Sequence, residues 1–197
     1  MIRFRSFSLS LLLALPLLQG CGPAFVGGAA MGVSILHDRR EAGIVLTDEK
    51  IELKAMAKIS EEPSLAEHSG VSITSYNQVA LLTGQADSPQ VKQGIADLVA
   101  GFPEVKRVID EVEVAPRASL RNESHDAYIT SRVKLALFDL ELPDFDPSRV
   151  KVVTEQDVVY LMGLVTEQEA HAVVEKVRYV NGVKRVVKIF EYIAAKS

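Results

Sequence analysis

The side chains that could carry out chemistry are few and scattered along the chain. The four histidines are His37, His68, His125 and His171. None stands at a metal-ligand spacing from another histidine or from the single cysteine. One group of carboxylates is close in sequence, but it lacks the alternating spacing and final glutamate of a calcium loop: Asp139, Glu141, Asp144 and Asp146. The sequence contains no nucleophile elbow or phosphate-binding glycine loop. We therefore expect no enzyme, no catalytic residue, no metal, no cofactor and no small-molecule substrate.

The single cysteine, Cys21, ends an apolar segment near the N-terminus. Arg3 and Arg5 come first, and the apolar residues 9–18 follow. A charged start followed by a short apolar segment is typical of a secretory signal and is too short for a stable spanning helix. A lone thiol exported to an oxidising compartment has no disulfide partner within the chain. The sequence therefore indicates that Cys21 has a role other than disulfide formation.

The residues Leu18-Gln19-Gly20-Cys21 resemble the lipobox of bacterial lipoproteins. The resemblance implies that residues 1–20 are removed as a signal peptide and that the Cys21 thiol is acylated. The alternative is an ordinary signal peptide with an incidental cysteine. Each buried methylene contributes about 0.8 kcal/mol, so several acyl chains would form a near-permanent anchor. Gly22 stands where an aspartate would imply inner-membrane retention, so the resemblance favours the periplasmic face of the outer membrane.

The mature chain is acidic. Loss of Arg3 and Arg5 leaves 20 of the 22 basic residues against 26 acidic ones. This balance argues against nonspecific nucleic-acid binding, which depends on contacts from Lys and Arg to phosphates. No later apolar segment reaches the roughly 20 residues needed to span a bilayer. We therefore expect a tethered protein that does not bind nucleic acid.

Residues 21–46 follow the predicted cleavage site and are rich in glycine and alanine. The glycines disfavour a stable helix. We interpret them as the acylated cysteine and a flexible tether. The alternative is a segment that lies against the membrane or the folded body, because the tether contains large apolar residues: Phe25, Val26, Ile35 and Leu36.

From Asp48 onward the sequence repeats itself. Three blocks recur in the same order 78 or 79 residues later, and the pairs are 71–74 with 150–153, 79–84 with 158–163, and 105–108 with 183–186. The segment between the two copies contains Pro, Ser and Asn and is typical of a linker. The domain division is therefore 47–114 for the first unit, 115–124 for the linker and 125–193 for the second unit.

Both units have the same predicted order of elements: helix, strand, strand, helix, strand. The first helix covers 48–60 or 126–140, and the second strand ends at Gly84 or Gly163. The second helix begins at Ser88-Pro89 in one unit, and at a capping box formed by Thr166 and Glu169 in the other. It ends at Gly101 or at Asn181-Gly182. The predicted fold class is α+β, with two tandem domains, each a three-stranded mixed sheet packed by two helices.

The repeated unit resembles the BON domain. The resemblance is carried by the glycine after the middle strand and by Gly182-Val183-Lys184-Arg185-Val186 at the entry to the last strand. Two such units behind a lipobox are similar to the dual BON-domain outer-membrane lipoproteins. That resemblance implies phospholipid association and a role in outer-membrane integrity and cell division, without catalysis.

The helix predicted over 126–140 has two distinct faces. Its core stripe is predicted to be Ile129, Val133, Ala136 and Leu140. A second group lies away from that stripe and consists of Tyr128, Ser131, Arg132, Leu135 and Phe138. Apolar side chains beside a basic one are typical of a surface that lies among lipid headgroups. The aligned positions of the three apolar residues in the first unit hold Lys50, Ala57 and Ser60. We predict that this face of the second unit binds phospholipid; the alternative is that it packs against the first unit.

Three functional hypotheses follow. The leading one is a lipid-anchored periplasmic module whose second unit binds anionic phospholipid membranes while the first supports or orients it. The second is a non-catalytic adaptor that docks an outer-membrane protein assembly machine through a sheet edge or the groove between the units. The third is a purely structural spacer.

Overall fold

The computed structural model describes residues 38–194, which belong to one compact unit, His37–Ser197. The predicted signal peptide, Cys21 and the apolar residues of the tether lie outside the described residues. None of the helices within residues 38–194 has the length and apolar character needed to cross a membrane.

The first repeat contains seven elements in residues 42–114. They are α2 (Ala42–Glu61), α3 (Pro63–Ala66), β1 (Ser69–Tyr76), β2 (Val79–Ala86), α4 (Pro89–Ala100), β3 (Arg107–Asp110) and β4 (Glu113–Val114). Strand β1 pairs antiparallel with β2, whereas β3 and β4 both run parallel to β2. The last strand of this repeat is thus divided into two short pieces, β3 and β4, on one side of β2.

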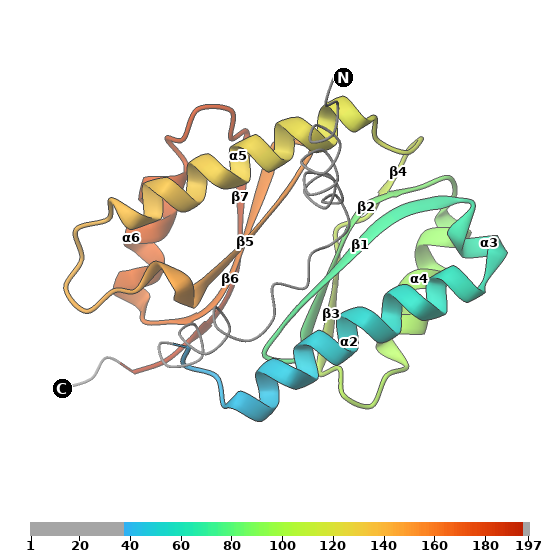
Figure 1. The fold of residues 1–197 in the computed structure, drawn as a ribbon, viewed down its shortest axis with the longest axis horizontal. Coiled ribbons are helices and arrows are strands. Elements are labelled where there is room, and N and C mark those ends of the chain that lie inside the picture. The colour runs from blue at the N-terminus through green and yellow to red at the C-terminus, as the bar shows by residue number, and fades with distance from the viewer. Residues whose placement is uncertain (1–37, 195–197) are drawn as a thin grey trace, which may run out of the picture. The chain divides into compact units, whose positions relative to one another are not determined.

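The second repeat contains the same arrangement in residues 120–192 (Figure 1). Its elements are α5 (Leu120–Phe138), η1 (Pro147–Arg149), β5 (Val150–Glu155), β6 (Val158–Val165), α6 (Glu167–Val177) and β7 (Arg185–Tyr192). Strand β6 is central, antiparallel to β5 and parallel to β7. The predicted α+β class, with a mixed sheet and packed helices in each repeat, is confirmed.

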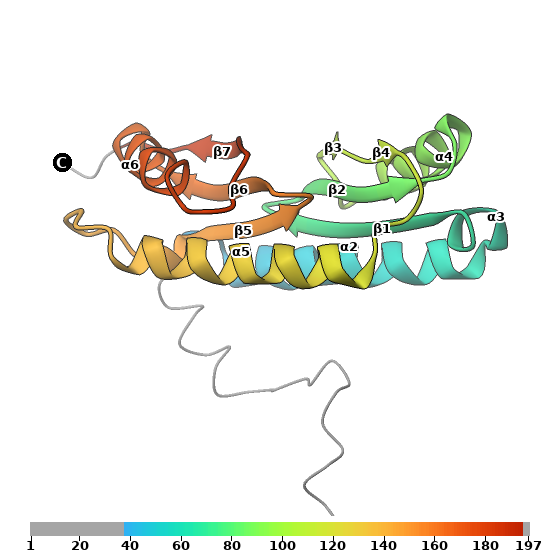
Figure 2. The same ribbon diagram turned by 90° about the horizontal axis from the view of Figure 1, so that it is seen from above.

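The four longer helices form two layers that run along opposite edges of the sheets, one next to β1 and β5 and the other next to β3 and β7. Figure 2 shows α2 and α5 along one side, and α4 and α6 along the other. We call these the α2/α5 layer and the α4/α6 layer. Both helices of a repeat nevertheless pack on the same face of its sheet and share one core. The other face of each sheet packs against the sheet of the other repeat.

Each repeat has its own apolar core, and a third cluster joins the repeats. The core of the first repeat is centred on Ile51, Ala55, Leu82, Ile95 and Val99. That of the second is centred on Ile129, Val133, Leu161, Val173 and Val177. The third cluster takes buried residues from both sheets: Tyr76, Val79, Leu81, Tyr160, Met162 and Ile189. Burial of large side chains from both repeats favours a fixed arrangement of the two.

The predicted starts of the two α4/α6-layer helices are confirmed. Ser88 Oγ accepts a hydrogen bond from the Val91 amide at 3.3 Å, and Pro89 follows it. Thr166 and Glu169 form a complete capping box at the start of α6. The predicted end of α4 at Gly101 is confirmed, whereas α6 already ends at Val177, before the predicted Asn181-Gly182.

The first helix of each repeat begins earlier than predicted. Helix α2 begins at Ala42 and α5 at Leu120, where Ser119 caps the helix by accepting from the Asn122 amide. The predicted starts, Asp48 and Asp126, are instead buried in the helix interiors. Their carboxylates look like caps in the sequence but bind another part of the fold, as described below.

Gly84 and Gly163 do not end their strands, which is a second correction. Strand β2 continues to Ala86 and β6 to Val165. A Cβ added at Gly84, where φ is +107°, would clash with the Gly70 carbonyl oxygen. A Cβ at Gly163 would lie 2.7 Å from the Arg149 carbonyl oxygen. Both glycines therefore permit a close approach of neighbouring backbone inside the sheet.

Candidate functional site

The buried side of α5 differs in part from the predicted stripe. Ile129 and Val133 are fully buried as predicted, but Ala136 and Leu140 are only half-buried. Leu137 is 1% exposed and provides the next core contact. The sequence Leu135 to Phe138 is apolar at all four positions, so it permits two phases of the stripe. Packing against the sheet selects the positions four residues apart.

The opposite side of α5 carries all five residues predicted to bind lipid. Tyr128, Leu135 and Phe138 are 58%, 60% and 72% exposed, and Ser131 and Arg132 are also exposed. The α5 face, as we call these five residues, does not pack against the first repeat. That alternative is excluded by the exposure of its aromatic side chains.

Helix α5 also carries cations that are available to an external anion. Arg121, Arg132 and Lys134 are exposed, and within residues 38–194 none of the three forms an ion pair. Cations without a partner beside exposed apolar residues are suited to contact anionic headgroups while the apolar side chains enter the interface.

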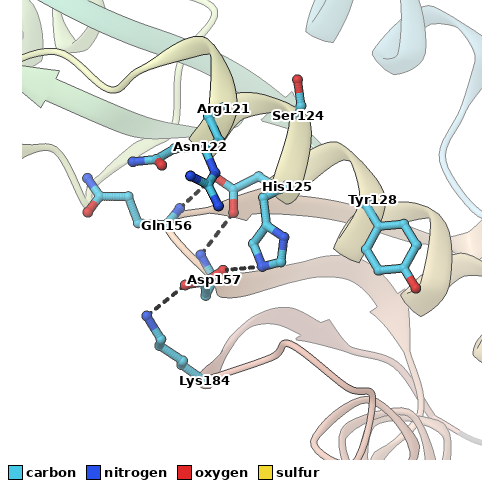
Figure 3. A pocket seen from close by; sticks show the side chains of 9 residues that line it. Arg121, Asn122, Ser124, His125, Tyr128, Gln156, Asp157 and Lys184 are labelled. Carbon is cyan, nitrogen blue, oxygen red and sulfur yellow. Dashed lines mark hydrogen bonds and ion pairs between the residues drawn. The ribbon is translucent and has the colours of Figure 1, made fainter.

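An open pocket lies beside the N-terminal half of α5 (Figure 3). Its volume is about 630 Å³, and its lining is Arg121, Asn122, Ser124, His125, Asp126, Tyr128, Gln156, Asp157 and Lys184. Asp157 joins its two sides, because its carboxylate lies 3.2 Å from His125 Nε2 and 2.7 Å from Lys184 Nζ. Hydrogen bonding to Asp157 and the charge of Asp157 raise the pKa of Lys184. Tyr128 belongs to both the pocket and the α5 face, so the two are contiguous.

Asp126 forms the floor of this region by holding the β5–β6 turn. Its two carboxylate oxygens accept from the amides of Gln156 and Asp157, each at 2.9 Å. Both turn residues have positive φ, 48° and 66°, in a left-handed conformation that is strained for residues other than glycine. A buried carboxylate that accepts both amides stabilises this turn. Asp126, which the sequence predicted as the start of the helix, therefore stabilises the β5–β6 turn.

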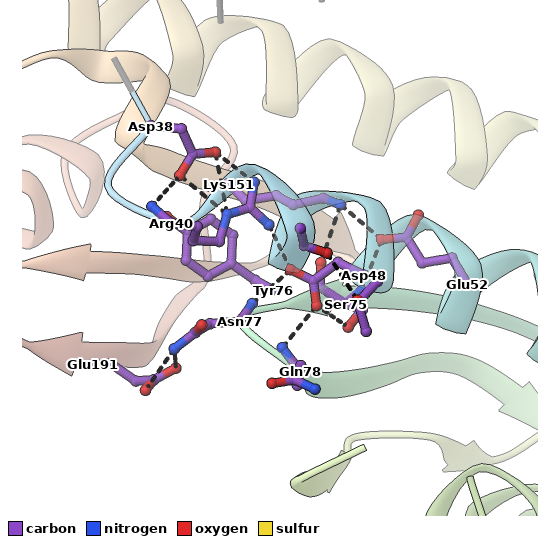
Figure 4. A network of polar contacts seen from close by, with 12 residues as sticks. Asp38, Arg40, Asp48, Glu52, Ser75, Tyr76, Asn77, Gln78, Lys151 and Glu191 are labelled. Carbon is purple, nitrogen blue, oxygen red and sulfur yellow. Dashed lines mark hydrogen bonds and ion pairs between the residues drawn. The ribbon is translucent and has the colours of Figure 1, made fainter. Parts of the chain in front are cut away.

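Asp48 does the same for the β1–β2 turn but has more partners (Figure 4). Its carboxylate accepts from the amides of Asn77 and Gln78 at 2.8 and 2.7 Å. It also accepts from Ser75 Oγ and from Arg40 Nη1, each at 2.7 Å. Asp48 is 2% exposed, whereas Asp126 is 8% exposed. No local pattern in the sequence indicates these contacts, and the only signal that points to them is the alignment of Asp48 with Asp126 in the two repeats.

Arg40 belongs to a short N-terminal strap, residues 38–41, that precedes α2. Its guanidinium forms hydrogen bonds to Asp38 and lies 3.9 Å from the centre of the Tyr76 ring. The strap therefore covers the end of α2 with a cation that is paired on one side and stacked on the other. The part of the predicted tether that the structure describes thus lies against the folded body.

Arg39 extends the strap to the second repeat. Its guanidinium donates to both carboxylate oxygens of Glu169, at 2.6 and 2.8 Å, and to the Leu164 carbonyl at 2.9 Å. Burial acts to raise the pKa of Glu169, but the hydrogen bonds from Arg39 and Thr166 outweigh it and lower that pKa. A bidentate contact between repeats fixes their relative orientation.

Further polar contacts cross between the repeats around the third apolar cluster. Lys151 Nζ lies 2.7 Å from a Glu52 carboxylate oxygen. Three more pairs are Asn77 with Glu191, Gln85 with Glu155, and Tyr160 with Glu111. Burial and the nearby Glu111 carboxylate raise the pKa of Tyr160 to about 12, so its hydroxyl remains a donor at neutral pH.

Comparison with known proteins identifies the class. A family model for the BON domain matches residues 47–116 and 125–194. The chain belongs to the BON-domain family, as a dual BON-domain outer-membrane lipoprotein. It is 34% identical over 177 residues to "Outer membrane lipoprotein DolP" of Haemophilus influenzae, covering 89% of this chain and 90% of that protein. It is 30% identical to the "21 kDa hemolysin" of Actinobacillus pleuropneumoniae, covering 79% of each.

Solved structures are more distant. The type III secretion protein CdsD of Chlamydia trachomatis matches with 14% identity and a TM-score of 0.30, over 76% of this chain and 65% of that one. A likeness at this level carries no argument about function. The family and the names of the two relatives point to a non-enzymatic lipoprotein and support an outer-membrane location.

Proposed function

We propose that the protein is anchored to the outer membrane through acylated Cys21, on the periplasmic side, and that it binds anionic phospholipid through the α5 face. This binding would help maintain the integrity of the outer membrane. In this proposal residues 1–20 are the signal peptide and 21–46 the acylated cysteine and tether. The domains are 47–114 and 125–193, joined by 115–124.

One observation carries the lipid proposal. Tyr128, Leu135 and Phe138 stand exposed on the side of α5 opposite its buried residues, next to Arg132. Exposed aromatic and aliphatic side chains on one helix face are costly in water unless they have a partner. Arginine without an ion-pair partner adds attraction to anionic headgroups, about 1 kcal/mol for each nearby cation. A bilayer interface meets both requirements.

Vesicle binding tests the lipid proposal. The mature chain with Cys21→Ser, which cannot be acylated, should sediment with vesicles containing anionic lipid and much less with purely zwitterionic vesicles. Binding to the anionic vesicles should weaken as salt is raised, because screening reduces the electrostatic contribution. Equal absence of binding to both vesicle types would refute the proposal and favour the adaptor hypothesis, in which a protein partner replaces the lipid.

The anchor has its own test. Cys21→Ala should abolish acylation and leave the signal uncleaved at this position. Mass spectrometry of the wild-type protein from membranes should show a mature N-terminal cysteine carrying acyl chains. An unmodified Cys21 in the mature wild-type protein would contradict the anchored location but would leave the vesicle result standing.

A further inference from the structure

The exposed apolar side chains gather on one of the two helical layers. Among residues 38–194, eleven large apolar residues are exposed. Seven of these lie on α2 or α5, and none lies on α4 or α6. The seven are Leu46, Leu53, Met56, Leu120, Tyr128, Leu135 and Phe138. Single exposed apolar residues are ordinary on protein surfaces, but their concentration on one layer is not.

The three on α2 lie on a single face. Leu46, Leu53 and Met56 are 56%, 61% and 59% exposed. At about 100° per residue, they fall within roughly 80° of one another around the helix. The opposite side of the helix packs into the core of the first repeat through Ile51, Ala55 and Ile59. Helix α2 therefore has an outward apolar face, which we call the α2 face.

Helices α2 and α5, which carry the two faces, lie along the same edge of the two sheets, next to β1 and β5. Figure 1 shows the two helices in front of the sheets, and Figure 2 shows them in one layer. The outward sides of both helices are those opposite the buried residues. A planar partner that contacts Tyr128 and Phe138 would thus also meet α2.

We propose that α2 is a second membrane-contacting element, and that Leu46, Leu53 and Met56 enter the same lipid surface as the α5 face. This inference rests on the proposed function, because it extends the lipid surface from the second repeat to the first. It assigns the first repeat a direct contact with the bilayer in addition to its structural role.

Two observations favour lipid as the occupant of the α2 face. First, α2 lies in one row with α5, along the same edge of the sheets. Second, α2 is the first described helix after Cys21, the predicted anchor. The 17 residues from Cys21 to Asp38 can span at most about 60 Å when fully extended, so an anchored chain keeps the start of α2 near the bilayer.

The contribution of α2 should be mainly apolar. Its Lys54 and Lys58 are paired with Glu104 and Glu61, whereas Arg132 and Lys134 of α5 have no such partner within the described part of the chain. We therefore expect α5 to supply most of the electrostatic attraction and α2 to add insertion at the headgroup boundary.

The absence of tryptophan from the chain permits a direct test. Three single-tryptophan variants are made in the mature chain carrying Cys21→Ser: Leu53→Trp, Tyr128→Trp and Tyr179→Trp. Each is mixed with anionic vesicles whose acyl chains are brominated, which quench only a tryptophan that reaches the apolar boundary. Tyr179 is 76% exposed and follows α6 in the other layer, so it is the matched control.

If both helices lie in the interface, we expect the fluorescence of Leu53→Trp and of Tyr128→Trp to be quenched by about half. The fluorescence of Tyr179→Trp should not be quenched. Quenching at Tyr128→Trp alone would overturn the α2 contact and leave the proposed function intact. Quenching at neither would overturn both proposals. Quenching at Leu53→Trp alone would contradict the joint surface.

A second measurement separates lipid from protein contact. Leu53→Ser with Met56→Ser should weaken vesicle binding about threefold to tenfold, without the strong salt dependence expected of the α5 cations. If the α2 face instead binds a second copy of the chain, this double variant would lower the molar mass in sedimentation and leave vesicle binding unchanged, which would overturn the inference.

Discussion

The two repeats share one fold but differ in what covers the start of their first helix. In the first repeat the strap folds back over Asp48, whose carboxylate receives Arg40 in addition to the two turn amides. In the second repeat the carboxylate of Asp126 accepts hydrogen bonds, within residues 38–194, only from the two amides of the equivalent turn. An open pocket lies beside it, lined by Arg121 and Lys184.

This difference shows how a duplicated unit can divide its tasks. The turn-holding aspartate is needed for folding in both repeats. The segment that precedes the first helix of each repeat then determines whether the surface beside this aspartate is covered or open. The strap closes the first repeat and bonds it to the second through Arg39. The second repeat keeps Tyr128 exposed at the same aligned position where the first has Lys50.

The largest expected difference concerns the two aspartates. Asp48→Ala should lower the free energy of unfolding by about 3–5 kcal/mol, because it leaves two turn amides, a serine hydroxyl and Arg40 without their buried acceptor. Asp126→Ala should cost about 1–3 kcal/mol, since only two amides lose their partner. Urea denaturation measures both. Equal losses of stability in the two variants, or a larger loss in Asp126→Ala, would contradict the proposed difference between the two aspartates.

The strap gives a smaller effect that depends on pH. Arg39→Ala should cost about 1–2 kcal/mol at pH 7. The pKa of Glu169 is lowered in the folded state, so its contribution is present above the unfolded value of about 4.3 and is lost as pH falls through the folded pKa. The cost of Arg39→Ala should therefore shrink towards pH 3, as measured by urea denaturation at each pH.

The control for the strap is Arg178→Ala, which removes an exposed pair with Glu175 three residues away on the same helix end. The free energy of unfolding of this variant should stay close to that of the wild type at both pH values. A loss at Arg39 as small as that at Arg178 would show that the strap does not join the repeats.

The smallest effect concerns Glu155, at the boundary between the repeats. Burial raises its pKa, as do the carboxylates of Asp126, Glu123 and Glu113, although the hydrogen bond from Gln85 acts to lower it. Ionised Glu155 therefore destabilises the folded state at neutral pH, and protonation removes that penalty as pH falls through its raised pKa.

Glu155→Gln should consequently raise the melting temperature at pH 7 by the equivalent of at most about 1 kcal/mol, and the gain should disappear near pH 4. Thermal melting followed by circular dichroism at the two pH values checks this. A variant that is less stable than wild type at pH 7 would show that the charge of Glu155 contributes favourably to the contact with Gln85.

The sequence predicted the fold well because the repeat supplied the same pattern twice. The order of elements followed from three recurring blocks, and the capping box at Thr166 placed α6 correctly. Features that depend on contacts distant in sequence were missed. Asp48 and Asp126 looked like helix starts, because nothing local reveals that they bind turn amides about 30 residues away. The roles of Gly84 and Gly163 depend on a neighbouring backbone in the same way.

The candidate surface was only partly predictable for the same reason. Helical spacing placed Tyr128, Leu135 and Phe138 on one side of the helix, and the structure shows that side exposed. The spacing could not show that α2 lies in the same layer, because that arrangement depends on packing between the repeats. The contact of Arg39 with Glu169 joins residues 130 positions apart and left no trace in the local pattern.

Tyr128→Glu provides the most direct test of lipid binding by the α5 face. The substitution places a negative charge where an amphipathic ring would enter the interface and adds repulsion from anionic headgroups. Binding of the Cys21→Ser mature chain to anionic vesicles should fall tenfold or more, which corresponds to only about 1.4 kcal/mol. The melting temperature should stay unchanged, because Tyr128 is 58% exposed and contributes little to the core.

Tyr179→Glu is the matched control, since it makes the same change at a 76% exposed tyrosine in the other layer. It should leave both vesicle binding and melting close to wild type. Lost binding by Tyr128→Glu with an intact melt, beside normal binding by Tyr179→Glu, is the predicted result. Normal vesicle binding by a well-folded Tyr128→Glu protein would contradict the assignment of the α5 face to lipid.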